Sequence, residues 1–491
     1  MTDEIADLSA IDLLRHYRRG TLSPVEATRA ALDRIARFND ELNAFILIDE
    51  AAALGSARAS EQRWRSGAPV GAVDGVPTTI KDMFLTRGWP TRRGSLTSSP
   101  DGPWDDDSPL AARLREHGAV LLGKTTQPEF GWKGVGDSPL TGITRNPWNP
   151  AKTPGGSSAG AAVAAAMGMG ALHAGGDGGG SIRIPASFTG IFGIKPTFGR
   201  VPNWPGRMPG SITHAGPMTR TVADAALMLT VMAGPDTRDW QALPYDGRDY
   251  TVGLEQGVSG LRVAYSATLG FASADPSVEA LTSKAAAEFS DFGAVVTKED
   301  PDIGNPRPAF ELYYSFRFTW LYDMLTEAQR KLLDPGLVAM AQSGRRYSAR
   351  VVLEADIFRN EMTPALDRFF DHHDLLLTPQ MPLPAFDAGH DFPPGRNYTN
   401  WLDWSPFTYP FNFSGHPAAS VPCGFVDGLP VGLQIVGPRY REDLVLREVE
   451  IRFQLLNAVA VAQIKVQFFH RVTIPRRALL TRRACHAPCQ S

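Results

Sequence analysis

The stretch GGDGGGSIRIP, residues 175–185, places a single serine behind a run of glycines. Glycine is costly inside a regular helix or strand, so a run of it indicates a backbone that must come close to another group. We interpret the amide groups of Gly178, Gly179, Gly180 and Ser181 as donors to a developing negative charge, with the hydroxyl group of Ser181 as the attacking group. This interpretation requires a base for Ser181 elsewhere in the chain.

The composition is typical of a soluble globular protein. The chain has 491 residues, of which 43% are hydrophobic and 21% charged, and its net charge of −3 gives no reason to expect a nucleic acid or an anionic membrane as partner. The acidic N-terminus lacks the pattern of a signal peptide, and no apolar run reaches the ~18 residues of a membrane span. Three cysteines are too few for a disulfide framework, so we expect a cytoplasmic protein with a small-molecule substrate.

The predicted secondary structure of the chain changes after the first 66 residues, which are helical. Within residues 1–66, Ser23-Pro24 followed by Glu26 is a helix start signal. From residue 67 short apolar strands alternate with helices, among them a strand at 76–82 and an Ala-rich helix at 158–170. This alternation predicts an α/β fold, a single large layered domain whose central sheet is covered by helices on both faces.

Three segments are expected along the chain. Residues 1–66 form a helical segment that packs on the core, and residues 67–450 form that core, together with it one domain. Residues 451–491 contain no acidic residue and form a divergent basic tail that could be poorly ordered. Helices are also expected at 273–291 and 354–370.

Two segments match the letter pattern of a known motif, but the residues around each match argue against that motif. Residues 118–125, GAVLLGKT, fit a phosphate-binding loop, but Ala, Val, Leu and Leu favour a buried strand, and a helix precedes them. Residues 156–160, GSSAG, fit a nucleophile elbow centred on Ser158, although proline-rich sequence precedes it where a strand is needed. The elbow would draw its base from the later histidines, which are His372, His373, His390 and His416.

A third constellation joins Lys81, Ser157 and Ser181. All three lie at polar strand ends or loops, where sites of open α/β sheets gather. Burial can lower the pKa of a lysine from ~10.4 towards neutrality, and a second serine can relay a proton between that lysine and the nucleophile. The simpler alternative is that the glycines form tight turns and that Lys81 is a solvated strand end.

The chain resembles the amidase signature family over about residues 5–446. The resemblance rests on several segments, which are GVPTTIKD (75–82), GAVLLGKTTQPEFG (118–131), NPWNPAKTPGGSSAGAAVAAA (146–166), GGDGGGSIRIPASFTGIFGIKPTFGRVP (175–202), HAGPMTRTVADAALML (214–229) and the later YPFNFSGHPAASVPCG and GLPVGLQIVG. It implies a mixed central sheet, a Ser–cis-Ser–Lys triad and no metal or organic cofactor. Many relatives are dimers, so a homodimer is one expected assembly.

The resemblance also assigns roles to residues. Ser181 corresponds to the nucleophile, Ser157 to the bridging serine that follows a cis peptide bond, and Lys81 to the base. The other matched positions are the oxyanion-hole glycines (Gly178, Gly179, Gly180), the supporting residues (Ser158, Asp177, Arg183) and two substrate-binding positions (Gly131, Trp132). Two features depart from the family: Gly178 stands where Thr, Ile or Val is usual, and the tail after about residue 447 does not match.

The expected reaction is hydrolysis of a carboxylic amide to a carboxylate and an amine or ammonia through a seryl acyl-enzyme. Six aromatic residues lie within the 13 positions 401–413, namely Trp401, Trp404, Phe407, Tyr409, Phe411 and Phe413. They are either core or, if some line the pocket, a sign that the substrate is an apolar or aryl amide. The alternatives are a carbamate or ester hydrolase, the glutaminase subunit of a tRNA-dependent amidotransferase, and a catalytically silent scaffold.

Overall fold

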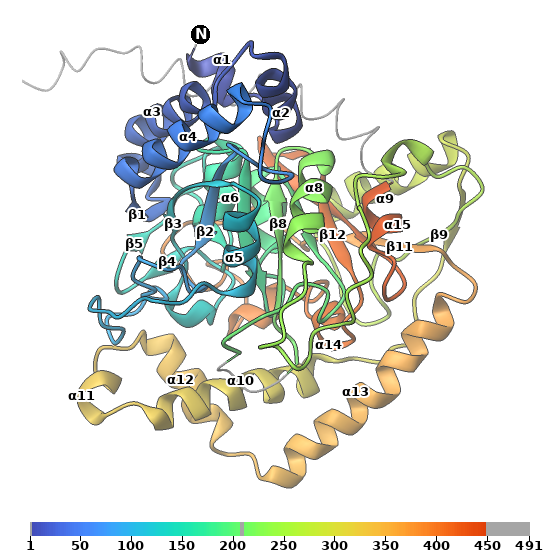
Figure 1. Cartoon of the computed structure of the whole chain (residues 1–491). Coiled ribbons are helices and arrows are strands. Elements are labelled where there is room, and N and C mark those ends of the chain that lie inside the picture. The colour runs from blue at the N-terminus through green and yellow to red at the C-terminus, as the bar shows by residue number, and fades with distance from the viewer. Residues whose placement is uncertain (1, 207–210, 448–491) are drawn as a thin grey trace, which may run out of the picture.

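The structure, a computed structural model, describes residues 2–206 and 211–447. Its centre is a mixed 11-stranded sheet in the order β1-β3-β2-β6-β8-β7-β12-β13-β11-β9-β10, flanked by helices (Figure 1). This confirms the predicted α/β class with a mixed central sheet. The predicted tail, residues 451–491, lies outside the described residues, and the division into 1–66 and 67–450 stays a prediction.

The strands of the large sheet are β1 (Phe45–Ile48), β2 (Pro77–Lys81), β3 (Val120–Thr125), β6 (Leu172–Asp177), β7 (Phe192–Lys195), β8 (His214–Thr219), β9 (Arg262–Tyr265), β10 (Val295–Lys298), β11 (Leu375–Pro379), β12 (Ala418–Val426) and β13 (Leu429–Val436). A separate pair is formed by β4 (Asp137–Ser138) and β5 (Gly142–Ile143).

The helices are α1 (Thr2–Ala6), α2 (Ala10–Arg19), α3 (Pro24–Leu42), α4 (Glu50–Arg65), α5 (Pro109–Glu116), α6 (Ala159–Ala166), α7 (Arg183–Thr189), α8 (Val222–Met232), α9 (Pro276–Asp291), α10 (Arg307–Met324), α11 (Glu327–Arg330), α12 (Pro335–Gly344), α13 (Ala349–Phe369), α14 (Pro410–Phe413) and α15 (Glu442–Arg447). Three short 3₁₀ turns are η1 (Glu129–Gly131), η2 (Leu254–Gln256) and η3 (Trp401–Trp404).

The N-terminal helices and helices α10–α13 lie at opposite ends of the molecule (Figure 1). At the first end, α3 packs against α1 and α4. Ser23 caps α3 with the predicted capping box, in which Ser23 and Glu26 each satisfy the other's backbone N–H. At the other end, α10 packs against both α12 and α13. The sheet between them is thus enclosed at both ends.

Two adjacent parallel strands determine where the polar residues meet. Strand β2 pairs in parallel with β6, with Ile80 opposite Ala174. Every residue of both strands is buried, as expected of a sheet covered on both faces. Because the strands are parallel, Lys81 at the end of β2 and Asp177 at the end of β6 emerge at the same edge of the sheet.

Helix α6 brings a second polar segment to that edge. It is shorter than the predicted 158–170, because the backbone turns left-handed at Gly168 and Gly170. Seven of its eight residues are buried, and a methyl group on Gly160 would overlap the carbonyl oxygen of Ala44 and lie 2.5 Å from Thr126 N. Small side chains therefore let α6 approach the sheet closely.

This close approach gives a stability prediction. We expect Gly160→Ala to destabilise the protein by about 3 kcal/mol or more, because the new methyl group meets backbone atoms that cannot move away. The matched control is Gly55→Ala on exposed α4, where nothing lies within 4 Å of the added methyl group. That substitution should stabilise the protein by about 0.5–1 kcal/mol through helix propensity. Urea unfolding measures both, and equal effects would contradict the packing of α6.

Candidate active site

Lys81 lies fully buried among hydroxyl groups at the end of β2. Its Nζ is 2.8 Å from Oγ of Ser157, 3.0 Å from Oγ of Ser158 and 3.4 Å from the carbonyl oxygen of Gly176. Burial lowers the pKa of Lys81 to about 7, although the negative charge of Asp177 acts in the opposite direction. A large fraction of Lys81 is therefore neutral at pH 7 and able to accept a proton.

The two serines that contact Lys81 have different hydrogen bonds. Ser158 Oγ donates to the carbonyl oxygen of Gly176 at 3.0 Å and accepts the N–H of Gly176 at 3.2 Å. Its proton is thus already engaged, so towards Lys81 it can only accept. Ser157 Oγ has no other recorded partner in the described part of the chain, so its proton is available to neutral Lys81. The Gly156–Ser157 peptide bond is cis.

Ser181 lies on the neighbouring segment, between β6 and α7. Its carbonyl oxygen accepts the N–H of Ser158 at 3.0 Å, which ties the two serine segments together. Its hydroxyl group makes no recorded hydrogen bond to any residue that the structure describes, Ser157 included. The structure thus brings Lys81, Ser157 and Ser158 into direct contact and places Ser181 beside them with a free hydroxyl group.

Packing explains two of the three glycines before Ser181. A methyl group on Gly179 would lie 2.8 Å from the ring of Trp401, and one on Gly180, whose φ is +124°, would lie 2.6 Å from Cβ of Thr408. At Gly178 a methyl group would make only ordinary contacts, at 3.8 Å, with Arg317 and Thr213. Glycine is therefore required at 179 and 180 but not at 178, the position where the chain departs from the pattern it resembles.

The amide of Gly180 is already engaged. It donates to Oδ1 of Asp177 at 2.6 Å, and the amide of Ile182 donates to Oδ2 at 3.1 Å. The amides of Gly178 and Gly179 have no recorded acceptor among residues 2–206 and 211–447. The amide of Gly180, one of the expected oxyanion-hole donors, is thus engaged within the loop itself. The expected oxyanion-hole role of Gly178 and Gly179 stays a prediction.

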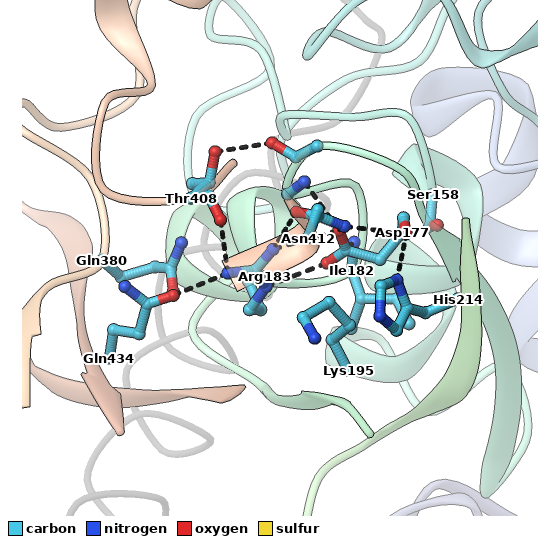
Figure 2. A network of polar contacts seen from close by, with 12 residues as sticks. Ser158, Asp177, Ile182, Arg183, Lys195, His214, Gln380, Thr408, Asn412 and Gln434 are labelled. Carbon is cyan, nitrogen blue, oxygen red and sulfur yellow. Dashed lines mark hydrogen bonds and ion pairs between the residues drawn. The ribbon is translucent and has the colours of Figure 1, made fainter. Parts of the chain in front are cut away.

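A buried ion pair closes the glycine loop at its two ends (Figure 2). Arg183 Nε donates to Oδ2 of Asp177 at 3.0 Å and Nη2 donates to Oδ1 at 3.1 Å, with no side-chain surface exposed on either residue. Burial alone raises the pKa of Asp177, but Arg183 and a hydrogen bond from Asn412 outweigh it and hold that pKa below its usual range. Asp177 is therefore charged.

Distant parts of the chain complete this network. The Arg183 guanidinium also donates to the carbonyl oxygen of Thr408 at 2.9 Å, to Gln434 at 2.7 Å and to Asn412 at 2.6 Å. Thr408 Oγ1 donates in turn to the carbonyl oxygen of Gly179 at 2.5 Å. The glycine loop is thus held by residues more than 200 positions away in the sequence, which Figure 2 shows around Arg183.

Comparison with known proteins determines the family of the chain. The model of the Amidase family matches residues 26–446, which is most of the chain. The chain belongs to the amidase signature family. An acylamidase from Rhodococcus erythropolis is 37% identical to this amidase over 455 residues, covering 90% of this chain and 94% of its own.

Two further relatives differ in their described activities. A glutamyl-tRNA(Gln) amidotransferase subunit from Myxococcus xanthus (strain DK1622) is also 37% identical, covering 90% of this chain and 96% of its own. The solved structure of a bacterial aryl acylamidase of the amidase signature family superposes with a TM-score of 0.87 at 31% identity, covering 93% of this chain and 98% of that one. The chain is an amide-hydrolysing enzyme with a small-molecule substrate.

A cavity of about 380 Å³ lies beside the glycine loop of this amidase. A methyl group on Gly131 would lie 3.1 Å from Oγ of Ser157 and 3.9 Å from Oε1 of Gln127, a residue that lines the cavity. The volume suits a small organic ligand. The cavity is lined by Met83, Arg93, Gln127, Phe130, Phe198, Gly199, Val201, Asn203, Trp204, Pro205, Gly206, Thr213, Arg238, Asp239, Trp240, Gln241 and Arg317.

Two sequence-based predictions concern this cavity, the contact of Trp132 with substrate and the choice between core and pocket lining for the aromatic residues at 401–413. The Trp132 side chain is buried in contact with Gly336 and does not line the cavity, which argues against its predicted contact with substrate. The six aromatic residues between 401 and 413 are all core, and none of them lines the cavity. The ring of Trp401 instead packs against Gly179.

The two competing motifs take no part in the site. Residues 120–125 are buried strand β3, and Lys124 donates to Thr91 and lies 3.6 Å from Asp82, so the residues of the phosphate-binding pattern are core. None of the recorded contacts of Ser158 involves a histidine, so the elbow lacks its histidine base within the described structure, and the proton of Ser158 is directed to Gly176 instead of to Lys81. No group of three His, Cys, Asp or Glu in residues 2–206 and 211–447 could hold a metal ion.

Sequence reasoning missed three residues of the cavity. Phe130 adopts a left-handed backbone with φ of 50°, and Gln127 and Arg317 each place an unpartnered polar atom in buried surroundings. Gln127 lies within one of the quoted family segments, but nothing in the sequence marks it as a cavity residue. For Arg317 the sequence does contain a signal. It is the one basic residue within the aromatic run YYSFRFTW (313–320), where the buried side of a helix would otherwise be apolar.

We predict that Arg183→Met destabilises the protein by about 3–5 kcal/mol, because Asp177 would stay buried without its partner charge. The control is Arg15→Met, which removes an exposed pair with Asp12 and should change stability by no more than about 0.5 kcal/mol. Urea unfolding of both variants measures this difference. Equal, small effects would show that the Asp177–Arg183 pair does not hold the loop.

Proposed function

We propose that this amidase hydrolyses an aryl or apolar amide through an acyl-enzyme on Ser181. The observation that carries the proposal is the buried Nζ of Lys81, with a pKa of about 7, at 2.8 Å from Oγ of Ser157. A neutral amine beside a hydroxyl group whose proton is free is the base that a serine nucleophile needs.

The first half of the reaction forms the acyl-enzyme. Neutral Lys81 takes the proton of Ser157, and Ser157 takes the proton of Ser181 as Oγ of Ser181 bonds to the carbonyl carbon. The amides of Gly178 and Gly179 stabilise the resulting oxyanion, and each such donor contributes about 3–4 kcal/mol. When the carbon–nitrogen bond breaks, Ser157 returns a proton to the departing amine and is reprotonated by Lys81.

The second half releases the acid. A water molecule gives its proton to Ser157, and thereby to Lys81, as its oxygen bonds to the acyl carbon. The bond to Oγ of Ser181 then breaks, Ser181 regains its proton from Lys81 through Ser157, and the carboxylic acid leaves and gives its remaining proton to solvent to become a carboxylate. Asp177 and Arg183 stay charged throughout and hold the loop, while Ser158 positions Lys81 against the carbonyl oxygen of Gly176.

The aryl preference is supported by the aromatic lining of the cavity, which includes Phe130, Phe198, Trp204 and Trp240. It is also supported by the similarity to the acylamidase and the aryl acylamidase. The same acyl-enzyme chemistry cleaves carbamates and esters. A catalytically silent scaffold is disfavoured, because it would have no need for Lys81 and Ser157 in direct contact with Ser181 beside them.

The glutaminase subunit is the second candidate, because the Myxococcus relative is as similar as the acylamidase. This function would be identified by the release of ammonia from glutamine in the presence of copurifying partner subunits. A homodimer stays a prediction. None of the helices within the described residues is long and apolar enough to cross a membrane. We keep the cytoplasm as the proposed compartment, where the buried thiol of Cys423 would remain reduced.

The triad is tested by three alanine variants assayed on 4-nitroacetanilide, with circular dichroism to verify folding. Ser181→Ala and Ser157→Ala should each lower kcat by at least about 1,000-fold, since they remove the nucleophile and its proton relay. Ser158→Ala should cost much less, because the proton of Ser158 is committed to Gly176. Activity that survives Ser181→Ala but not Ser158→Ala would overturn the proposal in favour of the elbow.

A further inference from the structure

Arg317 is a buried arginine without a carboxylate partner. It lies on α10 with 7% of its surface exposed, and Nη2 donates to Oγ1 of Thr213 at 2.8 Å. Its Nε has no hydrogen-bond acceptor, and its guanidinium forms no ion pair with any residue that the structure describes. By contrast, Arg307 on the same helix pairs with Glu311 and Asp403. Leaving a buried cation unpaired is costly, so a bound anion would stabilise Arg317.

The place of Arg317 connects it with the reaction. It lines the cavity together with Thr213, and its Nη1 would be 3.8 Å from a methyl group on Gly178, a residue of the proposed oxyanion hole. Gly178 precedes Ser181 by three residues. A ligand group bound to Arg317 would therefore sit within the same small molecule whose carbonyl carbon meets Ser181.

The charges around the cavity favour an anion. Arg93 and Arg238 line it as well, against a single carboxylate, that of Asp239. Both oxygens of Asp239 are already engaged, since they accept the backbone N–H of Asn203 at 2.8 Å and that of Gln241 at 2.9 Å. Because Arg238 already pairs with Asp236, the case for a bound anion rests on Arg317, whose guanidinium forms no ion pair within the described residues.

Gln127 adds an unpartnered acceptor on the triad side of the cavity. It is 1% exposed, and its Nε2 donates to the carbonyl oxygen of Asp82 at 3.3 Å, which leaves Oε1 without a donor in the described structure. Because a carbonyl oxygen can only accept, this contact determines the orientation of the Gln127 amide. Oε1 is itself buried and lies near Gly131, so Gln127 forms part of the cavity wall on the side of Ser157.

We propose that Arg317, with Thr213, binds a carboxylate on the substrate, so that the preferred substrates are amides carrying an anionic group in addition to the scissile bond. This inference rests on the proposed amide hydrolysis at Ser181 and narrows its substrate class. Arg317 is thus a specificity-determining residue. A free amino-acid amide such as glutamine is the other source of a carboxylate, and the test below includes it.

The test uses matched pairs of anilides on the full chain. The first pair carries the charge on the amine side, 4-acetamidobenzoate against 4-methylacetanilide. The second carries it on the acyl side, succinanilate against 4-methylpentananilide. Each is assayed with wild type, Arg317→Met, Arg317→Lys and the control Arg238→Met, whose guanidinium already pairs with Asp236 and stacks on Trp204. Ammonia release from glutamine is measured in parallel.

Wild type should favour the charged member of at least one pair by about 10- to 100-fold in kcat/KM, the loss expected for a hydrogen bond to a charged group. Arg317→Met should remove this preference, because it should lower kcat/KM for the charged member about 10- to 100-fold more than for the neutral member. Arg317→Lys should keep part of the preference, and Arg238→Met all of it.

Three results would overturn the inference. The first is no preference in wild type, and the second is an equal loss on charged and neutral anilides in Arg317→Met. In both cases the neutral anilides are still cleaved, so the proposed function stands. The third is failure to cleave any anilide, which contradicts the proposed function itself. A preference for glutamine that disappears in Arg317→Met would support the carboxylate site and overturn the aryl substrate.

Discussion

The buried pair between Asp177 and Arg183 is the constraint on which the site depends. Both charges are fully removed from water, which costs several kcal/mol for each unless close contacts offset it. Here the offset comes from the pair itself and from Thr408, Asn412 and Gln434. Because Asp177 ends β6 and Arg183 begins α7, the pair fixes both ends of the glycine loop. It also binds the amide of Gly180, so the remaining amides and Ser181 are held in one arrangement.

The same burial acts in opposite directions on two neighbouring ionisable groups. Asp177 stays charged because a guanidinium faces it, whereas Lys81 is surrounded only by two hydroxyl groups and a carbonyl oxygen. Burial therefore lowers the pKa of Lys81 to about 7, moderated by the more distant charge of Asp177. One buried acid thus holds the loop while one buried amine remains free to accept a proton. In the proposed mechanism, this combination lets a serine act as nucleophile without a histidine.

Local features were predictable from the sequence, and long-range ones were not. The capping box at Ser23, the strand that ends at Lys81 and the α/β alternation follow from neighbouring residues. The roles of Ser157 and Ser181 came from family resemblance. The engaged amide of Gly180, the core position of residues 401–413 and the cavity beside Arg317 depend on contacts between distant segments. Gly179 against Trp401 is one example, since neither position reveals the other in sequence.

The most direct test of the account is the rate at which a fluorophosphonate labels the enzyme, followed from pH 5 to 9, with the adduct located by peptide mapping. Neutral Lys81 is the active form, so the account predicts labelling on Ser181 that is slow below pH 7 and rises through about pH 7. In Lys81→Met labelling should be lost at every pH. An adduct on Ser158, or labelling of Ser181 that does not require Lys81, would contradict the lysine-driven triad.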